Sequence, residues 1–414
     1  MLQHWIWFAT RPNLSDRVKA NLLQHFHDAE DIFFADPEAF GVAGGMTEEE
    51  AESLLDKDLT QAGKIQEECA RNKIHILTYR DAAYPTRLRN IPDPPMVLYY
   101  QGTLPDFDSL PLIAVVGTRK ATAYGLTVAK RIGYQIAACG GIVVSGMASG
   151  IDAMAMQGAL TGDAPVIGVL GCGVDVVYPA SNRSLFEDTQ RYGCLLSEFV
   201  PGTEPFRWNF PKRNRIISGL SCGVLVVEAP EKSGALITAR QAADQGRDVF
   251  VVPGNIDVPN CAGSNALLRD GAIMVGSGWD VLSEYEALFP GKIKNRSKPS
   301  RQIAYPDEVE RQMAEEKPLL KVAQKPSIFS QREKKKKKEI DSVTSTQYSD
   351  AEKKHPPMTD HEKTVYALVE QGNTLVDDIM AAAGLPAGVV LAALTMLEVK
   401  GLLQRLPGKR VQLK

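Results

Sequence analysis

The sequence lacks any run of about eighteen apolar residues, the length that a membrane-spanning helix needs. Its first residues, MLQHWIWFATRP, carry neither a basic start nor a small-residue cleavage site, so they do not have the pattern of a secretory signal peptide. We therefore expect no membrane span and a cytoplasmic protein. We also expect Trp5, Ile6, Trp7 and Phe8 to belong to the core of a domain.

Cysteine and histidine are too scattered to build a metal or catalytic site. The six cysteines lie far apart with no C-x-x-C pair, which argues against a zinc site or a disulfide framework. All six histidines lie outside residues 81–290, and no Ser/His/Asp, Cys/His or metal-ligating set can be assembled there. We therefore expect a protein that is not an enzyme and that uses no metal and no cofactor.

The formal net charge of −3 hides an uneven distribution. Residues 292–358 hold 17 Lys and Arg against 10 Asp and Glu, so an acidic total does not exclude a polyanionic ligand. The same range is rich in Lys, Pro, Ser and Gln and has no apolar period. We predict a basic, disordered linker over residues 291–358. Lysine runs such as Lys334–Lys338 are usually solvated tails. The alternative is that this run adds weak, salt-sensitive affinity for polyanions.

The first eighty residues have the pattern of helices. Apolar residues recur at helical spacing in two stretches: Leu14, Val18, Leu22 and Phe26, then Ala51, Leu54, Leu55 and Leu59. We predict a helical domain over residues 1–80. Four prolines interrupt the next stretch, Tyr84–Gly102, so we predict a connector that ends in a short strand.

Strands and helices alternate through the middle of the chain. Short, continuous apolar runs are typical of buried parallel strands, and they occur at Ile113–Val116, Ile142–Val144, Val166–Leu170, Cys194–Leu196, Val224–Val227 and Val249–Val252. Helical stretches such as Leu126–Ala138 and Ala153–Leu160 separate them. We predict an α/β fold over residues 81–290, with a Rossmann-like, doubly wound, mostly parallel sheet and ligands at the carboxyl ends of its strands.

The last segment, residues 359–414, predicts a winged-helix domain. Thr359 and Glu362 fit a capping box, and further helices are expected over Val376–Ala383 and Val389–Lys400. Two short strands, Leu402–Leu406 and Arg410–Leu413, would form the wing. The third helix carries almost no side chain that reads base edges. We therefore expect it to contact protein or to serve in packing, rather than to bind a DNA groove.

Glycine-bearing turns follow several predicted strands, and such turns let an anion approach bare backbone N–H groups before a helix. The first turn contains Gly117, Thr118, Arg119 and Lys120, the second contains Ser145, Gly146 and Gly150, and the third is followed by Asn182. No glycine falls two residues after Gly117, so the dinucleotide pattern G-x-G-x-x-G is absent. Asp152 is either a metal ligand or base or, about three times more often for such a residue, a structural hydrogen-bond acceptor.

The stretch from Phe206 to Ala239 combines cations, aromatic rings and a further turn of this kind. It holds four basic residues, Arg207, Lys212, Arg213 and Arg215, among Phe206, Trp208 and Phe210. Asn214 lies between the last two cations, and a Ser233-Gly234 turn then opens a helix that carries Thr238. Cations beside aromatic rings suit a phosphate backbone whose bases can stack. The sequence therefore predicts a polyanion pocket.

These motifs together resemble the DNA processing protein A (DprA/Smf) family. The matching segments are GTR at Gly117–Arg119, SGMASGID at Ser145–Asp152, GCGVDVVYP at Gly171–Pro179, FPKRNRIISGLS at Phe210–Ser221, SGALITA at Ser233–Ala239, VFVVPG at Val249–Gly254 and GSNALLRDGA at Gly263–Ala272. The resemblance covers about Tyr84 to Val281. The predicted helical domain over residues 1–80 lies where this family has a sterile-alpha-motif-like or helix-hairpin-helix-like module. The family's usual serine after Gly234 is Ala235 here, which we expect to be tolerated.

The resemblance implies a recombination mediator that binds single-stranded DNA, protects it during natural transformation and helps to load the RecA recombinase. It implies that Arg119, Lys212, Arg213 and Arg215 hold phosphates. Backbone donors would come from Gly146, Gly150, Ser233 and Gly234, and Asn182 and Asn214 would orient the pocket. The family also implies a homodimer. Four apolar residues near the last edge of the sheet, Leu267, Leu268, Ile273 and Met274, form either a dimer surface or ordinary core.

Two other functions remain open from the sequence. A nucleotide phosphoribohydrolase on a related fold would carry the motif PGGxGTxxE. If Thr238 corresponded to the threonine of this motif, the glutamate of the motif would correspond to Gln241, which has no carboxylate. This alternative rests on likeness of fold alone. A scaffold with an incidental anion pocket is the remaining interpretation.

Overall fold

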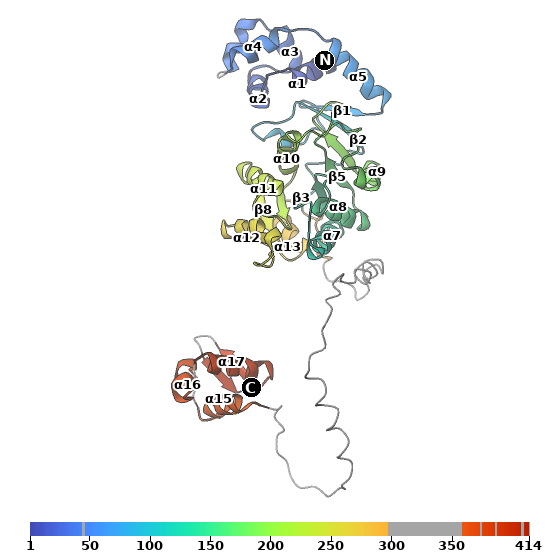
Figure 1. Ribbon diagram of the computed structural model, residues 1–414. Coiled ribbons are helices and arrows are strands. Elements are labelled where there is room, and N and C mark those ends of the chain that lie inside the picture. The colour runs from blue at the N-terminus through green and yellow to red at the C-terminus, as the bar shows by residue number, and fades with distance from the viewer. Residues whose placement is uncertain (44–45, 297–357, 373–374, 386, 407–409, 414) are drawn as a thin grey trace, which may run out of the picture. The chain divides into compact units, whose positions relative to one another are not determined.

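The computed structural model describes residues 1–43, 46–296, 358–372, 375–385, 387–406 and 410–413 (Figure 1). They belong to two compact units, one within Met1–Glu315 and the other within Glu316–Lys414. Residues 297–357, which make up most of the predicted linker and include Lys334–Lys338, lie outside the described residues. The predicted division into four parts therefore stays a prediction. None of the helices described is long and apolar enough to cross a membrane.

The N-terminal region is helical, as predicted. Its elements are α1 (Leu2–Thr10), α2 (Asp16–His25), α3 (Ala29–Phe34), the 3-10 helix η1 (Pro37–Ala43), α4 (Glu48–Leu55) and α5 (Thr60–Arg71). Trp5, Ile6, Trp7 and Phe8 are buried in the core, which confirms that expectation. Leu55 is an exception to the predicted apolar face of α4, because it is 49 % exposed.

A nine-stranded sheet forms the centre of the first unit. Its strands are β1 (His75–Thr78), β2 (Val97–Gly102), β3 (Leu112–Val116), β4 (Ile142–Ser145), β5 (Val166–Val169), β6 (Cys194–Ser197), β7 (Gly223–Val226), β8 (Asp248–Val251) and β9 (Ile273–Met274). Their order is β1-β2-β6-β5-β4-β3-β7-β8-β9. All seven strands from β6 to β9 in this order pair in parallel, whereas β1 and β2 pair antiparallel. The α/β, mostly parallel fold is confirmed.

Helices cover both faces of this sheet because both faces of each central strand are apolar. Along β3, Ile113 and Val115 belong to one buried cluster, and Leu112, Ala114 and Val116 belong to the other. The first cluster includes side chains of α7 (Ala123–Ala138), α8 (Ile151–Thr161), α9 (Arg183–Tyr192) and α13 (Gly278–Leu282). The second includes side chains of α6 (Thr86–Arg89), α10 (Asn209–Leu220) and α11 (Gly234–Asp244).

The antiparallel edge joins the N-terminal helices to the sheet. Helix α1 packs against β2 and α5 packs against β1. Strand β2 is the one predicted at the end of the connector, whereas β1 and the two-residue edge strand β9 were not predicted. Both lie at the ends of the sheet, where short strands give the weakest sequence pattern. The remaining helix of this region, α12 (Ala262–Arg269), follows the 3-10 helix η3 (Pro259–Cys261).

The second unit is the predicted winged-helix fold. It contains α15 (Asp360–Glu370), α16 (Val376–Ala382), α17 (Ala387–Val399) and an antiparallel pair of strands, β10 (Leu403–Leu406) and β11 (Arg410–Leu413). The expected capping box of Thr359 and Glu362 is present at the start of α15. The Glu362 carboxylate also accepts a hydrogen bond from Lys400 Nζ at 2.6 Å, which ties α15 to the end of α17.

Candidate functional site

A pocket lies at the carboxyl ends of three neighbouring parallel strands, β3, β4 and β5. It is lined by Arg119, Gly146, Ala148, Ser149, Leu170, Gly171, Cys172, Tyr178, Pro179 and Phe210. The first three turns predicted from the sequence meet here because parallel strands bring their carboxyl ends to one edge. Phe210 comes from the first turn of α10, on the face of the sheet that this helix covers. Four separate segments of the chain therefore build one concave surface.

Two arginines flank the Phe210 ring. The guanidinium carbon of Arg119 is 5.1 Å from the ring centroid and that of Arg213 is 5.9 Å from it, both within the range of a cation–π contact. The Tyr178 ring lies 5.5 Å from Phe210 on the pocket wall. Arg119 is exposed, whereas Arg213 is only 4 % exposed. Phe210 thus has two cations beside it: Arg119, which is exposed and lines the pocket, and Arg213, which is buried and does not belong to the lining.

Arg213 is held by the backbone of the sheet. Its Nη1 donates a hydrogen bond to the carbonyl oxygen of Val169, at the end of β5. Among the described residues, its buried Nε has no hydrogen-bond partner. Gly146 makes room for it, because a methyl group at that position would collide with the guanidinium. Burial lowers the pKa of Arg213 to about 10, an effect that Asp152 opposes and Arg119 reinforces, so Arg213 remains charged at neutral pH.

The loop from Gly146 to Gly150 is shaped by two polar side chains. Asp152 is buried and accepts a hydrogen bond from the backbone N–H of Gly146 at 3.1 Å. Burial raises its pKa, and Arg213 opposes that shift. Asn182 Nδ2 donates to the carbonyl oxygen of Met147 at 2.9 Å. Asp152 therefore has the structural role that the sequence favoured, and Asn182 orients the loop beside the pocket.

The point where the strand order reverses, between β3 and β7, is filled by the protein itself. The Glu228 carboxylate accepts hydrogen bonds from Thr122 N and Oγ1 at 2.8 and 2.7 Å. Thr118 N donates to the Glu228 carbonyl oxygen at 2.7 Å, and a side chain at Gly117 would collide with Ile151. The pocket therefore lies beside this point rather than in it. Thr118 and Gly117 shape the turn that presents Arg119.

Other predicted site residues lie outside the pocket lining. Ser145 is fully buried and donates to the Val115 carbonyl oxygen at 2.6 Å, Gly150 contacts the Thr118 carbonyl oxygen, and Lys120 is exposed on the same turn. Asn214 Nδ2 donates to the Gly234 carbonyl oxygen at 3.4 Å, which links α10 to the start of α11. Ser233 caps α11, and Thr238 is buried within it. The structure thus gives most of these residues supporting contacts.

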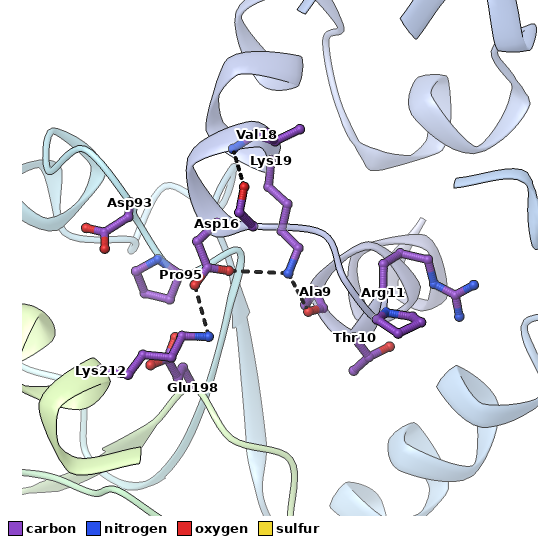
Figure 2. A network of polar contacts seen from close by, with 12 residues as sticks. Ala9, Thr10, Arg11, Asp16, Val18, Lys19, Asp93, Pro95, Glu198 and Lys212 are labelled. Carbon is purple, nitrogen blue, oxygen red and sulfur yellow. Dashed lines mark hydrogen bonds and ion pairs between the residues drawn. The ribbon is translucent and has the colours of Figure 1, made fainter. Parts of the chain in front are cut away.

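Lys212 and Arg215 do not line the pocket but belong to a network of carboxylates. Figure 2 shows Lys212 in this network beside Asp16 and Glu198. Lys212 Nζ lies 3.0 Å from Asp16 Oδ2 and 3.7 Å from Glu198 Oε2. Arg215 Nη2 donates to the same Asp16 oxygen at 3.1 Å and also pairs with Glu198, while its Nε lies 3.3 Å from Asp93. Asp16 is the first residue of α2, so this network ties the N-terminal helices to α10.

The network is close to neutral. Lys19 Nζ completes it at 3.3 Å from Asp16, which gives three cations and three carboxylates. Burial alone would raise the pKa of Asp16, but Lys19, Lys212 and Arg215 together lower it to about 2. Burial raises the pKa of Glu198, and Arg215 and Lys212 only partly oppose that effect. Lys212 and Arg215 are therefore electrically compensated, unlike Arg119 and Arg213.

Comparison with known proteins agrees with these motifs. The model of the family DNA recombination-mediator protein A matches residues 75–286, and the DprA winged helix domain matches residues 349–409. The chain is 34 % identical over 99 % of its length to Protein Smf of Synechocystis, of which it covers 98 %. The chain belongs to the DNA processing protein A (DprA/Smf) family.

Two further DprA proteins give the extent of the likeness. DNA processing protein DprA of Bacillus subtilis is 42 % identical over 51 % of this chain and 71 % of its own. The X-ray structure of DprA from Streptococcus pneumoniae aligns with a TM-score of 0.61 and 32 % identity, and covers 69 % of this chain and 98 % of that one. The DprA-type fold therefore extends well beyond the residues that line the pocket.

Of the ten residues that line the pocket, the predicted DprA site included Arg119 and Gly146, and it left out both aromatic residues, Phe210 and Tyr178. The sequence could have predicted a place for Phe210 in the site. Phe210 precedes Arg213 by three residues, and residues three apart lie on the same face of a helix. Arg207, which lies between the aromatic residues 206 and 208, is also exposed and was not placed in the site. Gln241, the position that the enzyme alternative required to be acidic, donates to the Pro211 carbonyl oxygen at 3.3 Å.

The four apolar residues predicted as a possible dimer surface fall into two pairs. Ile273 and Met274 form the edge strand β9 and are 39 % and 67 % exposed. Leu267 and Leu268 are partly buried against the core cluster on the α10 face. The structure therefore places the first pair at an open sheet edge and gives the second pair a packing role.

Proposed function

We propose that this chain is a single-stranded DNA-binding recombination mediator, and that backbone phosphates bind between Arg119 and Arg213. The observation that carries the proposal is the buried Arg213, which has a free Nε–H and stands beside the exposed Arg119. Two cations face one buried carboxylate, Asp152, so the pocket has a surplus of positive charge. Membership of a family named for DNA recombination mediation supports a nucleic acid as the anion.

The proposed pocket suits a phosphate better than a dinucleotide. Gly146 lines the pocket next to the guanidinium of Arg213, and the exposed Arg119 lines the same pocket with donors that suit a phosphate oxygen. Phe210 and Tyr178 supply ring faces on the same surface. Charged and aromatic groups alternating in this way hold single strands without reading their sequence.

Three finer roles rest on the family likeness. We propose that the protein protects incoming DNA in natural transformation, that it helps to load RecA and that it forms a homodimer. RecA filament assembly on a single strand covered by single-strand-binding protein tests the second role, and no acceleration by this protein would refute it. The exposed edge strand β9 supports the third. Sedimentation of Met274→Asp tests it, since an unchanged dimer would exclude this edge.

The first test is a salt titration of binding to a labelled oligo-dT and to the matching duplex. Arg119→Ala is expected to weaken oligo-dT binding by about 10- to 100-fold, the worth of a charge-assisted hydrogen bond. The slope of affinity against salt should also decrease, because one fewer phosphate is neutralised. Gly146→Ala should weaken binding too, since its methyl group displaces the Arg213 guanidinium.

The matched control is Arg191→Ala. Arg191 is exposed near the end of α9, which precedes β6, so it lies toward the amino ends of the strands and away from the pocket. Its loss should change affinity by less than about twofold, as for a distant surface charge at physiological salt. Equal effects of Arg119→Ala and Arg191→Ala, or equal binding of single strand and duplex, would contradict the pocket assignment.

A further inference from the structure

Trp208 is an exposed aromatic side chain in a protein that buries other tryptophans. It is 71 % exposed, whereas Trp5 is 3 % and Trp7 is 1 % exposed. Its neighbour Phe206 is 41 % exposed. The two rings stack, with centroids 4.8 Å apart and an interplanar angle of 6°. Large apolar side chains held in solvent in this way mark a surface for a ligand rather than for the core.

The turn beneath these rings is ordered by hydrogen bonds. Asn209 N donates to the Phe206 carbonyl oxygen at 3.0 Å, and Phe206 N donates to the Glu204 carbonyl oxygen at 2.9 Å. Asn209 is itself buried, and Trp208 is the residue at the cap of α10. The backbone that carries the two rings is therefore ordered by its own hydrogen bonds. A backbone that is already ordered loses less conformational entropy when a ligand binds.

The ring pair comes just before Phe210, a residue of the pocket lining, at the start of α10. Phe210 follows Trp208 by two residues and contributes its ring to the pocket, with Arg119 over it. A helix rises about 1.5 Å per residue, so both positions lie within the first turn of α10. A nucleotide spans more than this distance, and a strand whose phosphate sits beside Arg119 brings a neighbouring base to the level of Trp208.

We propose that the Phe206–Trp208 ring pair is a stacking platform for one unpaired base of the strand held in the Arg119–Arg213 pocket. This inference rests on the proposed function. The occupant is a base because the exposed indole face continues a site for a polyanion, and a base is the flat apolar group that such a strand carries. Bases inside a duplex stack on each other and have no free face, so the platform favours single strands.

The test separates bases from phosphates. The full-length protein is titrated with oligo-dT and with an abasic oligonucleotide of the same length, which keeps the phosphates and lacks the bases. Trp208→Ala is expected to weaken oligo-dT binding by about tenfold and to leave abasic binding within about twofold of the original. Trp208→Phe should restore most of the oligo-dT affinity, because a phenyl ring still offers a face for stacking.

Arg119→Ala provides the contrast, since it should weaken the binding of both oligonucleotides. An equal loss for both ligands in Trp208→Ala, or no loss for either, would overturn the platform while leaving the phosphate pocket standing. If the unmodified protein binds neither oligonucleotide, the proposed function fails, and the platform fails with it. Thermal unfolding of each variant shows whether the fold is intact, and an exposed position such as 208 is expected to leave it unchanged.

Discussion

Arg213 and its neighbours on α10 meet opposite electrical surroundings on the two faces of one helix. Toward the pocket, Arg213 and the nearby Arg119 have one buried carboxylate, Asp152, close to them. Toward the N-terminal helices, Lys212 and Arg215 contact three carboxylates. Four adjacent positions, KRNR, therefore supply both a ligand site and a structural connection. The comparison teaches that basic residues adjacent in the sequence need not share one function.

The carboxylate side also explains why the N-terminal helices remain attached to the sheet unit. Asp16 begins α2, Glu198 follows β6, and Asp93 lies in the proline-rich connector. Arg215 reaches all three, which are separated by up to about half of the chain. A buried group of this kind contributes to specificity of packing, because breaking it leaves charges without partners.

The largest expected effect comes from removing the central cation of this network. Arg215→Ala should lower the free energy of unfolding by about 3–5 kcal/mol, since buried carboxylates then lack their main partner. Urea denaturation monitored by circular dichroism measures this change. Arg240→Ala, at an exposed position of α11, is the control and should change stability by less than about 0.5 kcal/mol. Equal free energies of unfolding for the two variants would show that the network does not stabilise the fold.

The next effect concerns the pH dependence of stability. The folded protein holds the pKa of Asp16 at about 2, below its ordinary value, so its ionised form stabilises the fold above pH 4. That contribution is lost as pH falls through about 4 to 2. It amounts to roughly 2 kcal/mol, at about 1.4 kcal/mol per pKa unit. Asp16→Asn should therefore be less stable than the original protein at pH 7, and the difference should shrink below pH 4.

Denaturation midpoints of both proteins between pH 8 and acid conditions test this expectation. Asp31→Asn is a suitable control, because Asp31 is exposed on α3 and is not a member of the network. A stability difference between Asp16→Asn and the original protein that stays constant into acid would mean that Asp16 acts through packing rather than charge. The comparison of the two faces of α10 would then lose its electrostatic basis.

The smallest effect is expected for Lys212 in DNA binding. Its side chain is 47 % exposed, but its ammonium nitrogen already lies 3.0 Å from Asp16 Oδ2. Lys212→Ala should therefore change oligo-dT affinity by less than about threefold, against about 10- to 100-fold for Arg119→Ala. Titration at two salt concentrations measures both. A loss for Lys212→Ala as large as that for Arg119→Ala would show that phosphates compete with Asp16 for this cation, as the sequence motif suggested.

The sequence by itself determined the fold to a large extent. Apolar runs placed six strands of the sheet within one or two residues, and the Thr359–Glu362 capping box placed the start of the winged-helix unit. These features are local, because periodicity and capping depend on residues a few positions apart. The glycine-bearing turns also predicted which edge of the sheet holds the pocket, since parallel strands end together.

Only the tertiary structure decided which cations belong to that pocket. Arg213 and Arg215 are two residues apart in one motif, yet one contacts the end of β5 and the other contacts Asp16, 199 positions away. Helix geometry turns such residues to different faces, and the charge on each face comes from distant segments. The same holds for Phe206 and Trp208, whose stacking depends on a turn that the sequence pattern does not specify. The local sequence pattern determines where helices and strands form, whereas contacts between distant segments determine what each side chain does.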